Sequence, residues 1–139
     1  MNIIVTSHGD LCLGLIDSLE MLAGEQEKVI AISLKKNDTG QFKEEFRLLV
    51  EEKLSEPTLI LCDILGGTPY NESHQLFLEH PDYLRVVSGV NLAMLIECTL
   101  SVASMTSLQE LSEVAINSGK QSIEEVLLET NIEEDEIEF

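Results

Sequence analysis

Positive charge is scarce in this chain of 139 residues. It has 8 Lys and Arg against 26 Asp and Glu, which gives a formal net charge of −18. Six of the eight bases lie between residues 28 and 53. Such an acidic protein repels phosphate backbones and anionic lipid surfaces, so nucleic acid is excluded as a partner. We expect the acidic surface to steer basic partner proteins toward it.

Tryptophan, paired cysteines and long apolar runs are also missing. With no Trp and only two Tyr, the chain lacks the aromatic rings that would enclose a flavin. The three cysteines are far apart and form no CxxC motif, so we predict reduced, half-buried thiols at Cys12, Cys62 and Cys98. No apolar run approaches the ~20 residues of a membrane span, and no basic leader precedes a cleavage site. The sequence predicts a cytoplasmic protein without a metal or a cofactor.

The remaining composition is that of one ordinary domain with an acidic end. Hydrophobic residues make up 44% of the chain, which is enough for a single core at this length. Residues 121–139 hold eight acids and no Lys or Arg, and the last stretch, 132–139, is predicted to be a frayed acidic tail. We predict one domain at residues 1–124, followed by an acidic C-terminal tail at residues 125–139.

Apolar runs and helical periodicity alternate along the chain. Short apolar or β-branched runs predict strands, and apolar residues at helical spacing predict helices. The predicted strands are 2–6, 29–34, 58–63 and 84–88, and the predicted helices are 11–22, 39–54, one ending near 79, 92–100 and 107–118. This alternation predicts an α/β fold with a parallel sheet and helices on both faces.

The first predicted strand runs into the polar sequence Thr6-Ser7-His8-Gly9. In open α/β sheets, ligands and chemistry lie beyond the carboxyl ends of the strands. His8 is the only side chain in this turn that can act as a nucleophile or proton carrier near neutral pH. We therefore predict that His8 is the reactive residue.

The third predicted strand ends at Asp63, which is followed by Gly66-Gly67-Thr68-Pro69. Glycines allow close approach of a ligand, and a helix that starts here offers backbone amides to an oxyanion. We expect Thr68 to be the N-cap of this helix and Pro69 its first residue. A sharp turn without chemistry is the plainer interpretation, but an aspartate at the same expected sheet edge as His8 argues for a site.

The fourth predicted strand ends in Ser88-Gly89-Val90-Asn91, again with a glycine before a helix. His74, on the third predicted helix, and His80, beside a proline, are predicted to be surface or capping residues. If the first, third and fourth strands are neighbours, one sheet edge holds His8, Asp63, Thr68, Ser88 and the amides of Gly66, Gly67 and Gly89.

Together these motifs resemble the IIA component of mannose-family phosphotransferase systems. The similar segments are Ser7-His8-Gly9, Asp63-Ile64-Leu65-Gly66-Gly67-Thr68-Pro69-Tyr70-Asn71 and Ser88-Gly89-Val90-Asn91-Leu92-Ala93-Met94-Leu95. The resemblance covers about residues 1–120. It implies a flavodoxin-like fold with strand order 2-1-3-4 and a homodimer. It also implies a final antiparallel strand, here at 120–124, that is exchanged between subunits.

The resemblance also implies a function and a set of partners. The carrier would accept a phosphoryl group on His8 from the phosphocarrier HPr and pass it to a IIB component. The membrane components IIC and IID would be indirect partners, so the protein would be cytoplasmic and peripheral at the membrane through this complex. The phosphate-binding residues would be Ser7, Gly9, Gly66, Gly67, Thr68, Ser88 and Gly89, and the partner surface would be Pro69, Asn71, Val90, Asn91 and Met94.

A histidine that accepts a phosphoryl group needs one free ring nitrogen, so the other nitrogen must hold the proton. A carboxylate that accepts this N–H fixes the tautomer and stabilises the cation formed during transfer. Asp63 is the candidate for this role. Amides of residues 66–68 and the hydroxyls of Thr68 and Ser88 could hold the phosphoryl oxygens. No Lys or Arg occurs in the turns after the first and third strands, so we expect a lightly neutralised phosphate.

Other classes share parts of this pattern. A response-regulator receiver domain has an aspartate at the end of its third strand, but it needs an acidic pair after the first strand to bind magnesium. The phosphoryl-donor subunit of a phosphoenolpyruvate-dependent dihydroxyacetone kinase shares the fold and the histidine and is the second candidate. Its third-strand turn normally lacks Gly-Gly-Thr-Pro. A flavodoxin-like binding module without chemistry is the remaining alternative.

Overall fold

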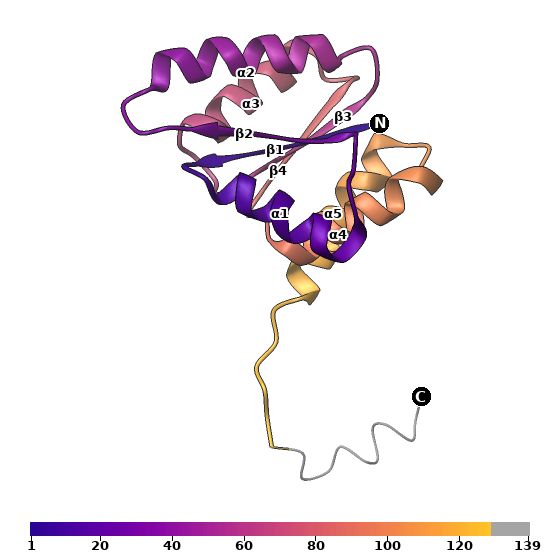
Figure 1. Cartoon of the computed structure of the whole chain (residues 1–139). Helices are drawn as coiled ribbons and strands as arrows, with labels where there is room; N and C mark the ends of the chain where they lie inside the picture. The colour runs from indigo at the N-terminus through magenta and orange to yellow at the C-terminus, as the bar shows by residue number, and fades with distance from the viewer. Residues whose placement is uncertain (129–139) are drawn as a thin grey trace.

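The structure of the chain is a computed structural model, and it describes residues 1–128. Within these residues, none of the helices combines the length and the apolar character needed to cross a bilayer. The elements in chain order (Figure 1) are β1 (Asn2–His8), α1 (Leu11–Ala23), β2 (Val29–Leu34), α2 (Thr39–Lys53), β3 (Thr58–Cys62), α3 (Thr68–Glu79), β4 (Leu84–Ser88), α4 (Leu92–Ser101), the 3₁₀ helix η1 (Val102–Ser104) and α5 (Leu108–Gln121).

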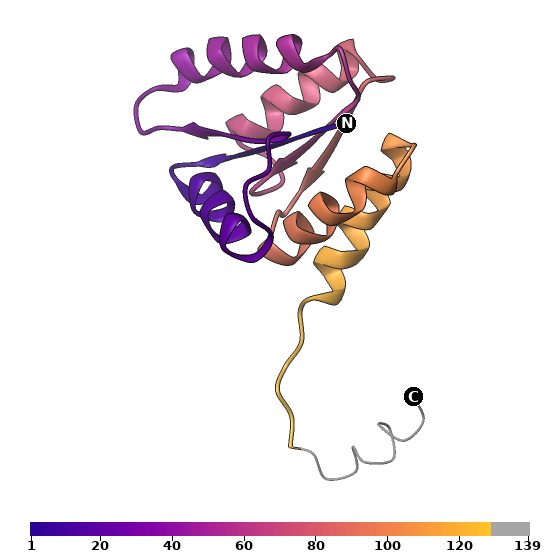
Figure 2. The same ribbon diagram turned by 45° about the vertical axis from the view of Figure 1, so that its right-hand side comes forward.

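The strands form one parallel sheet in the order β2-β1-β3-β4, which confirms the predicted fold class. α2 and α3 cover one face, and α1, α4 and α5 cover the other (Figures 1 and 2). Successive strand residues point to opposite faces, so Ile4 joins a core with Phe46 on one side and Val5 joins a core with Leu95 on the other. The sheet is buried on both faces, which leaves its carboxyl edge for a site.

Two strands end at other residues than predicted. β1 continues to His8, because His8 still pairs with Leu34 of β2. β3 ends at Cys62, so Asp63 is the first residue after the strand. Both differences leave His8 and Asp63 together at the carboxyl edge of adjacent strands.

The three cysteines are free thiols, as predicted. Each is fully buried rather than half-buried, because Cys12 and Cys98 pack into the core on the α1 side and Cys62 lies in a central strand. Burial raises the pKa of Cys62 and of Cys98 to about 12. These thiols are therefore protonated and unreactive at neutral pH.

The end of the described chain differs from the prediction of a helix ending at 118 and a strand at 120–124. α5 passes through Gly119 and ends at Gln121, so the first two residues of the predicted strand are helical. Gly119 serves close packing instead of ending the helix, because a Cβ at this residue would lie 2.8 Å from Met94 Cε. Residues 123–128 have no regular secondary structure and lead away from the domain (Figure 1).

Three features expected at the C-terminal end stay predictions. Exchange of a strand between subunits concerns a second copy, and the structure describes a single chain. The division at residue 124 into domain and tail is likewise a prediction. Most of the predicted acidic tail, residues 129–139, lies outside the described residues.

Candidate active site

His8 and Asp63 meet where β1 and β3 end. Asp63 Oδ2 accepts the backbone N–H of His8 at 2.9 Å and lies 2.8 Å from His8 Nδ1. The imidazole is 48% exposed, whereas the carboxylate is only 9% exposed. One carboxylate oxygen therefore holds both the main chain and the ring of His8. This arrangement places the proton on Nδ1 and leaves Nε2 as the free nitrogen.

The Asp63 carboxylate is kept in its charged form. Burial on its own would raise its pKa, but N–H groups of His8 and Ile64 and the His8 ring donate to the charged oxygens, and together they lower the pKa. Asp63 Oδ1 accepts the Ile64 N–H at 3.0 Å. Asp63 is therefore ionised at neutral pH and can stabilise positive charge on the imidazole.

The Gly66-Gly67 turn brings the start of α3 against the His8 ring. Both glycines have a positive φ, 81° and 82°, which L-residues with a side chain rarely adopt. A Cβ on Gly67 would lie 2.9 Å from His8 Cε1 and 3.2 Å from His8 Nε2. Gly67 is the N-cap of α3 and Pro69 is in its first turn, so the predicted N-cap role of Thr68 is wrong. The free nitrogen of His8 thus lies beside a helix N-terminus.

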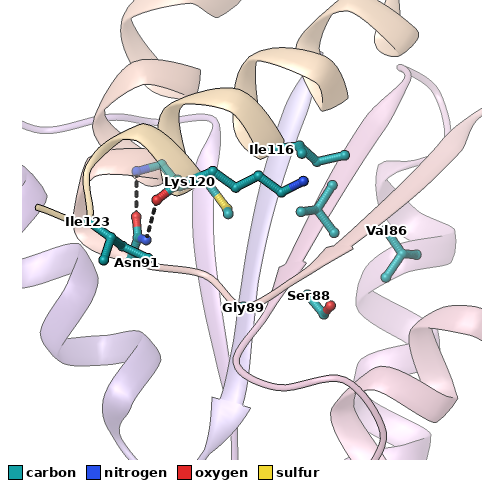
Figure 3. Close-up of a pocket in the computed structure, with 10 residues that line it drawn as sticks. Val86, Ser88, Gly89, Asn91, Ile116, Lys120 and Ile123 are labelled. Carbon is teal, nitrogen blue, oxygen red and sulfur yellow. Dashed lines mark hydrogen bonds between the residues drawn. The ribbon is translucent and has the colours of Figure 1, made fainter.

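Ser88 is the last residue of β4 and Gly89 follows it, and β4 is one strand farther from His8 than β3. The turn is tied to β3, because Val90 N–H donates to Cys62 O at 3.0 Å. Ser88 and Gly89 line a cavity of about 360 Å³ between β4 and α5, into which Lys120 extends (Figure 3). They share the carboxyl edge with His8, but no contact joins them to it in the hydrogen-bond network of residues 1–128.

Two predicted phosphate ligands have other tasks. Ser7 is fully buried; its Oγ accepts the Cys12 N–H at 2.8 Å and donates to Gly9 O at 3.0 Å. The Gly9 N–H donates to Leu34 O at 2.7 Å. Ser7 and Gly9 therefore shape the turn that presents His8, and their polar groups are already bonded.

The predicted partner surface is mostly buried. Pro69, Val90 and Met94 are all buried: Pro69 lies in the first turn of α3, and Val90 and Met94 belong to the core on the α1 side of the sheet. Asn91 is the N-cap of α4: its Oδ1 accepts the Met94 N–H at 2.9 Å, and its Nδ2 donates to a carbonyl of α5 at 3.2 Å (Figure 3). Of this set, Asn71 is exposed.

Exposed apolar side chains close to the site were missed from the sequence. Leu11, three residues after His8, is 52% exposed, and Ile64 and Leu65, directly after Asp63, are 56% and 74% exposed. The signal that could have found them is the presence of large apolar residues in a turn rather than in a strand or helix. All three follow His8 or Asp63 closely in sequence, and we call this set of exposed apolar side chains the Leu65 rim.

Two lysines were also missed. β2 is adjacent to β1, and its last residue, Leu34, pairs with His8. Lys35 and Lys36 follow at once and are exposed. The expectation of a lightly neutralised phosphate considered only the turns after the first and third strands. Because β2 lies beside β1 in the sheet, the turn after β2 also lies at the edge that holds His8.

The remaining histidines lie away from this edge. His74 is exposed on α3, with its ring 5.8 Å from that of Tyr70, and His80 caps the end of the same helix. The surface and capping roles predicted for them are confirmed.

Comparison with known proteins agrees with this geometry. A family model described as PTS system fructose IIA component matches residues 2–116. The fructose-specific EIIA component of Bacillus subtilis is 32% identical over 113 residues, 80% of this chain and 76% of that protein. A crystal structure of a phosphotransferase system component EIIA from Streptococcus agalactiae has a TM-score of 0.80 at 34% identity and covers 89% of this chain and 95% of that one.

A third relative is longer. The mannose-specific EIIAB component of Escherichia coli K12 is 28% identical over 123 residues, which is 87% of this chain but 38% of that protein. The chain thus spans under half the length of this relative. The family model, by contrast, covers most of the chain, including β1, the Gly66-Gly67 turn and α4. The chain therefore belongs to the mannose-type IIA family of the sugar phosphotransferase system.

Proposed function

We propose that this chain is a phosphoryl carrier of the bacterial sugar phosphotransferase system. His8 Nε2 accepts a phosphoryl group from the phosphocarrier HPr and passes it to a IIB component, which couples sugar uptake to sugar phosphorylation. The single observation that carries the proposal is the 2.8 Å contact between His8 Nδ1 and Asp63 Oδ2, because it leaves Nε2 free beside the start of α3.

The transfer step follows from this arrangement. The lone pair of His8 Nε2 attacks the phosphorus of the donor's phosphohistidine, and the bond from that phosphorus to the donor nitrogen breaks. The electron pair of the broken bond stays on the donor nitrogen. The proton on His8 Nδ1 stays in its hydrogen bond to Asp63 Oδ2, and the carboxylate balances the positive charge that develops on the ring. Transfer to the IIB component is the same step in the opposite direction.

The start of α3 supports the transferred group. A phosphoryl group on Nε2 would lie next to Gly67, whose missing side chain leaves room for it. The amides in the first turn of α3 and the Thr68 hydroxyl are close in sequence to this point, and the helix dipole favours negative charge there. Phosphoryl transfer passes through a loose transition state, so positioning and charge stabilisation supply most of the rate.

The Leu65 rim supports a protein as the reaction partner. A small substrate is usually held in an enclosed cavity, whereas the His8 ring is open, and Leu11, Ile64 and Leu65, which follow His8 and Asp63 closely in sequence, are exposed. Exposed apolar groups beside a reactive residue are typical of protein interfaces. The name of the E. coli relative joins IIA and IIB in one protein, which favours a IIB component as acceptor here. Such a complex would hold this carrier near the membrane components.

A homodimer is part of the proposal. β4 is an outer strand of the sheet, and an open strand edge readily pairs with another chain. Beyond α5, Ile123, Val126 and Leu128 are 79%, 97% and 90% exposed. Exposure of these apolar side chains to water is unfavourable. A second copy that receives residues 123–128 beside β4 would bury them. The cavity that Ile123 and Lys120 line beside β4 lies on this route (Figure 3).

The test is phosphorylation by the complete system. We expect the chain, incubated with the general phosphotransferase proteins and phosphoenolpyruvate, to gain one acid-labile phosphate, and His8→Ala to abolish it. His74→Ala and His80→Ala are the matched controls, since both residues lie away from the carboxyl edge. Labelling that persists in His8→Ala would overturn the proposal.

A further inference from the structure

The turn after β2 lies at the same sheet edge as His8. β1 and β2 end side by side (Figure 1), and the last pair in their ladder is His8 with Leu34. The next contact is the 2.7 Å hydrogen bond from Gly9 N–H to Leu34 O. The carbonyl carbon of Leu34 is bonded to the Lys35 nitrogen. Lys35 and Lys36 thus begin directly beside the turn that presents His8.

This turn holds both lysines at the edge. Asp38 N–H donates to Lys35 O at 3.2 Å, and Asn37 has a φ of 64°, which together make a tight reversal into α2. Both lysine side chains are exposed, and neither forms an ion pair with any residue in 1–128. In contrast, Arg47 and Lys28 are paired with glutamates at 2.9 and 2.7 Å. The two ammonium groups are therefore available for another anion.

The charge around His8 is otherwise unfavourable for a phosphate. Asp63 carries a negative charge in contact with the ring, and Asp10 is exposed two residues after His8 and makes no side-chain cap bond to α1. A phosphoryl group would add up to two more negative charges. Negative charges that lie close together repel one another. Salt at physiological strength screens this repulsion only beyond about 8 Å. A cation close to the site would offset this repulsion.

We propose that Lys35 and Lys36 form the cationic part of the phosphoryl site and stabilise phosphorylated His8 electrostatically. The inference rests on the proposed function and adds two residues to it. Each lysine has a flexible four-carbon stem that starts one strand away from His8 and can follow the phosphoryl group. Because the ammonium groups stay in water, their attraction is moderate. Moderate attraction suits a carrier, which must release the group to the next protein.

The experiment uses phosphoramidate, a small donor that needs no protein partner. His8 Nε2 attacks its phosphorus, the phosphorus–nitrogen bond breaks and ammonia leaves. The unsubstituted chain is compared with Lys35→Gln, Lys36→Gln and the double variant. The matched control is a Lys28→Gln, Lys53→Gln double variant, which removes the same charge at the opposite sheet edge, where β2 begins and α2 ends.

Two readouts separate an electrostatic role from a structural one. At low salt, the Lys35, Lys36 double variant should be phosphorylated about fivefold more slowly, and the difference should shrink as salt is added. In phosphorus NMR, the titration midpoint of the phosphoryl group on His8 should rise by about half a pH unit, because a nearby cation favours its dianion. The control double variant should match wild type in both.

The opposite results are equally clear. Equal rates and equal titration midpoints in the double variant and wild type at low salt overturn the role of the lysines. A control variant that changes as much as the double variant overturns it too, because the effect would then be one of net charge. Wild-type chain that takes no phosphate on His8 overturns the proposed function itself, and this inference with it.

Discussion

A single oxygen of Asp63 holds both the ring and the backbone of His8. Oδ2 lies 2.8 Å from Nδ1 and 2.9 Å from the His8 main-chain nitrogen. If the His8 ring rotates, it loses its hydrogen bond to Asp63 Oδ2. The same oxygen also accepts the backbone N–H of His8 and so holds the end of β1 in place. The tautomer and the direction of Nε2 are therefore set by the same carboxylate before any partner arrives.

Asp63→Asn tests whether this carboxylate takes part in the chemistry. Asparagine keeps the size and can accept one hydrogen bond, but it loses the charge that stabilises the imidazolium-like state. A hydrogen bond to a charged group is worth about 1.5–3 kcal/mol, so transfer should slow by about ten- to a hundredfold. The variant should still be folded at the assay temperature, because β3 keeps its buried residues. An unchanged transfer rate with an intact fold would remove Asp63 from the site.

Gly67→Ala should damage the site more than Gly66→Ala. Both glycines have a positive φ, so both substitutions strain the backbone. Only at residue 67 would the new Cβ also meet the His8 ring, 2.9 Å from Cε1, whereas residue 66 has nothing within 4 Å. We expect similar losses of melting temperature but a transfer rate at least about tenfold lower for Gly67→Ala than for Gly66→Ala. Equal transfer rates would show that the clash is relieved without moving the ring.

The fold, and the meeting of His8 and Asp63 at one sheet edge, could be predicted from the sequence because each rests on a local pattern. The alternation of strands and helices predicts the sheet, and His8 and Asp63 stand where polar residues interrupt apolar runs. Burial of Pro69 and Met94 was not predictable in this way, since whether a residue after a turn faces solvent depends on how its helix packs. The end of the last helix was predicted too early, at 118, because Gly119 packs against Met94 and α5 continues to Gln121.

The cations were missed for a different reason. Lys35 lies in another βα unit than His8, and no periodicity links the two. They become neighbours only because β2 is placed beside β1 in the sheet. The resemblance implied the strand order 2-1-3-4. The predicted site nevertheless left out the turn that follows the second strand.

Stability at low pH should depend on Asp63. Its pKa is lowered in the folded state, so its stabilising contribution is present above the unfolded value of about 4 and is lost as pH falls through the folded value. In urea unfolding, the free energy of unfolding of wild type should exceed that of Asp63→Asn near pH 6. This difference should disappear as the pH falls below about 4. A difference between the two proteins that is constant over this pH range would contradict the assignment.

Residues 122–128 should decide the oligomeric state. The full chain should sediment at about twice its mass of 15.5 kDa. Truncation after Leu128 removes only residues outside the described part and should keep the dimer, whereas truncation after Gln121 removes the exposed apolar segment and should give a monomer. A monomeric full chain at micromolar concentration, or a dimer that survives the shorter truncation, would count against exchange of this segment.

Leu65→Ser tests the Leu65 rim as the docking surface for the phosphoryl donor. Leu65 is 74% exposed, so serine removes apolar area from the surface without opening a cavity in the core. If HPr covers this side chain, kcat/KM for phosphorylated HPr should fall about tenfold, which corresponds to about 1.4 kcal/mol of lost contact. The rate with phosphoramidate should not change, because the small donor makes no use of the rim.

Leu100→Ser is the matched control, since Leu100 is 62% exposed near the end of α4 that is farther from the carboxyl edge. It should leave both rates unchanged. A Leu65→Ser variant that is slow with both donors would mean that residue 65 acts by shaping the Asp63 turn. An unchanged rate with phosphorylated HPr would place the docking surface elsewhere around His8. Only selective loss with the protein donor assigns Leu65 to the interface, because both donors use the same nitrogen and the same carboxylate.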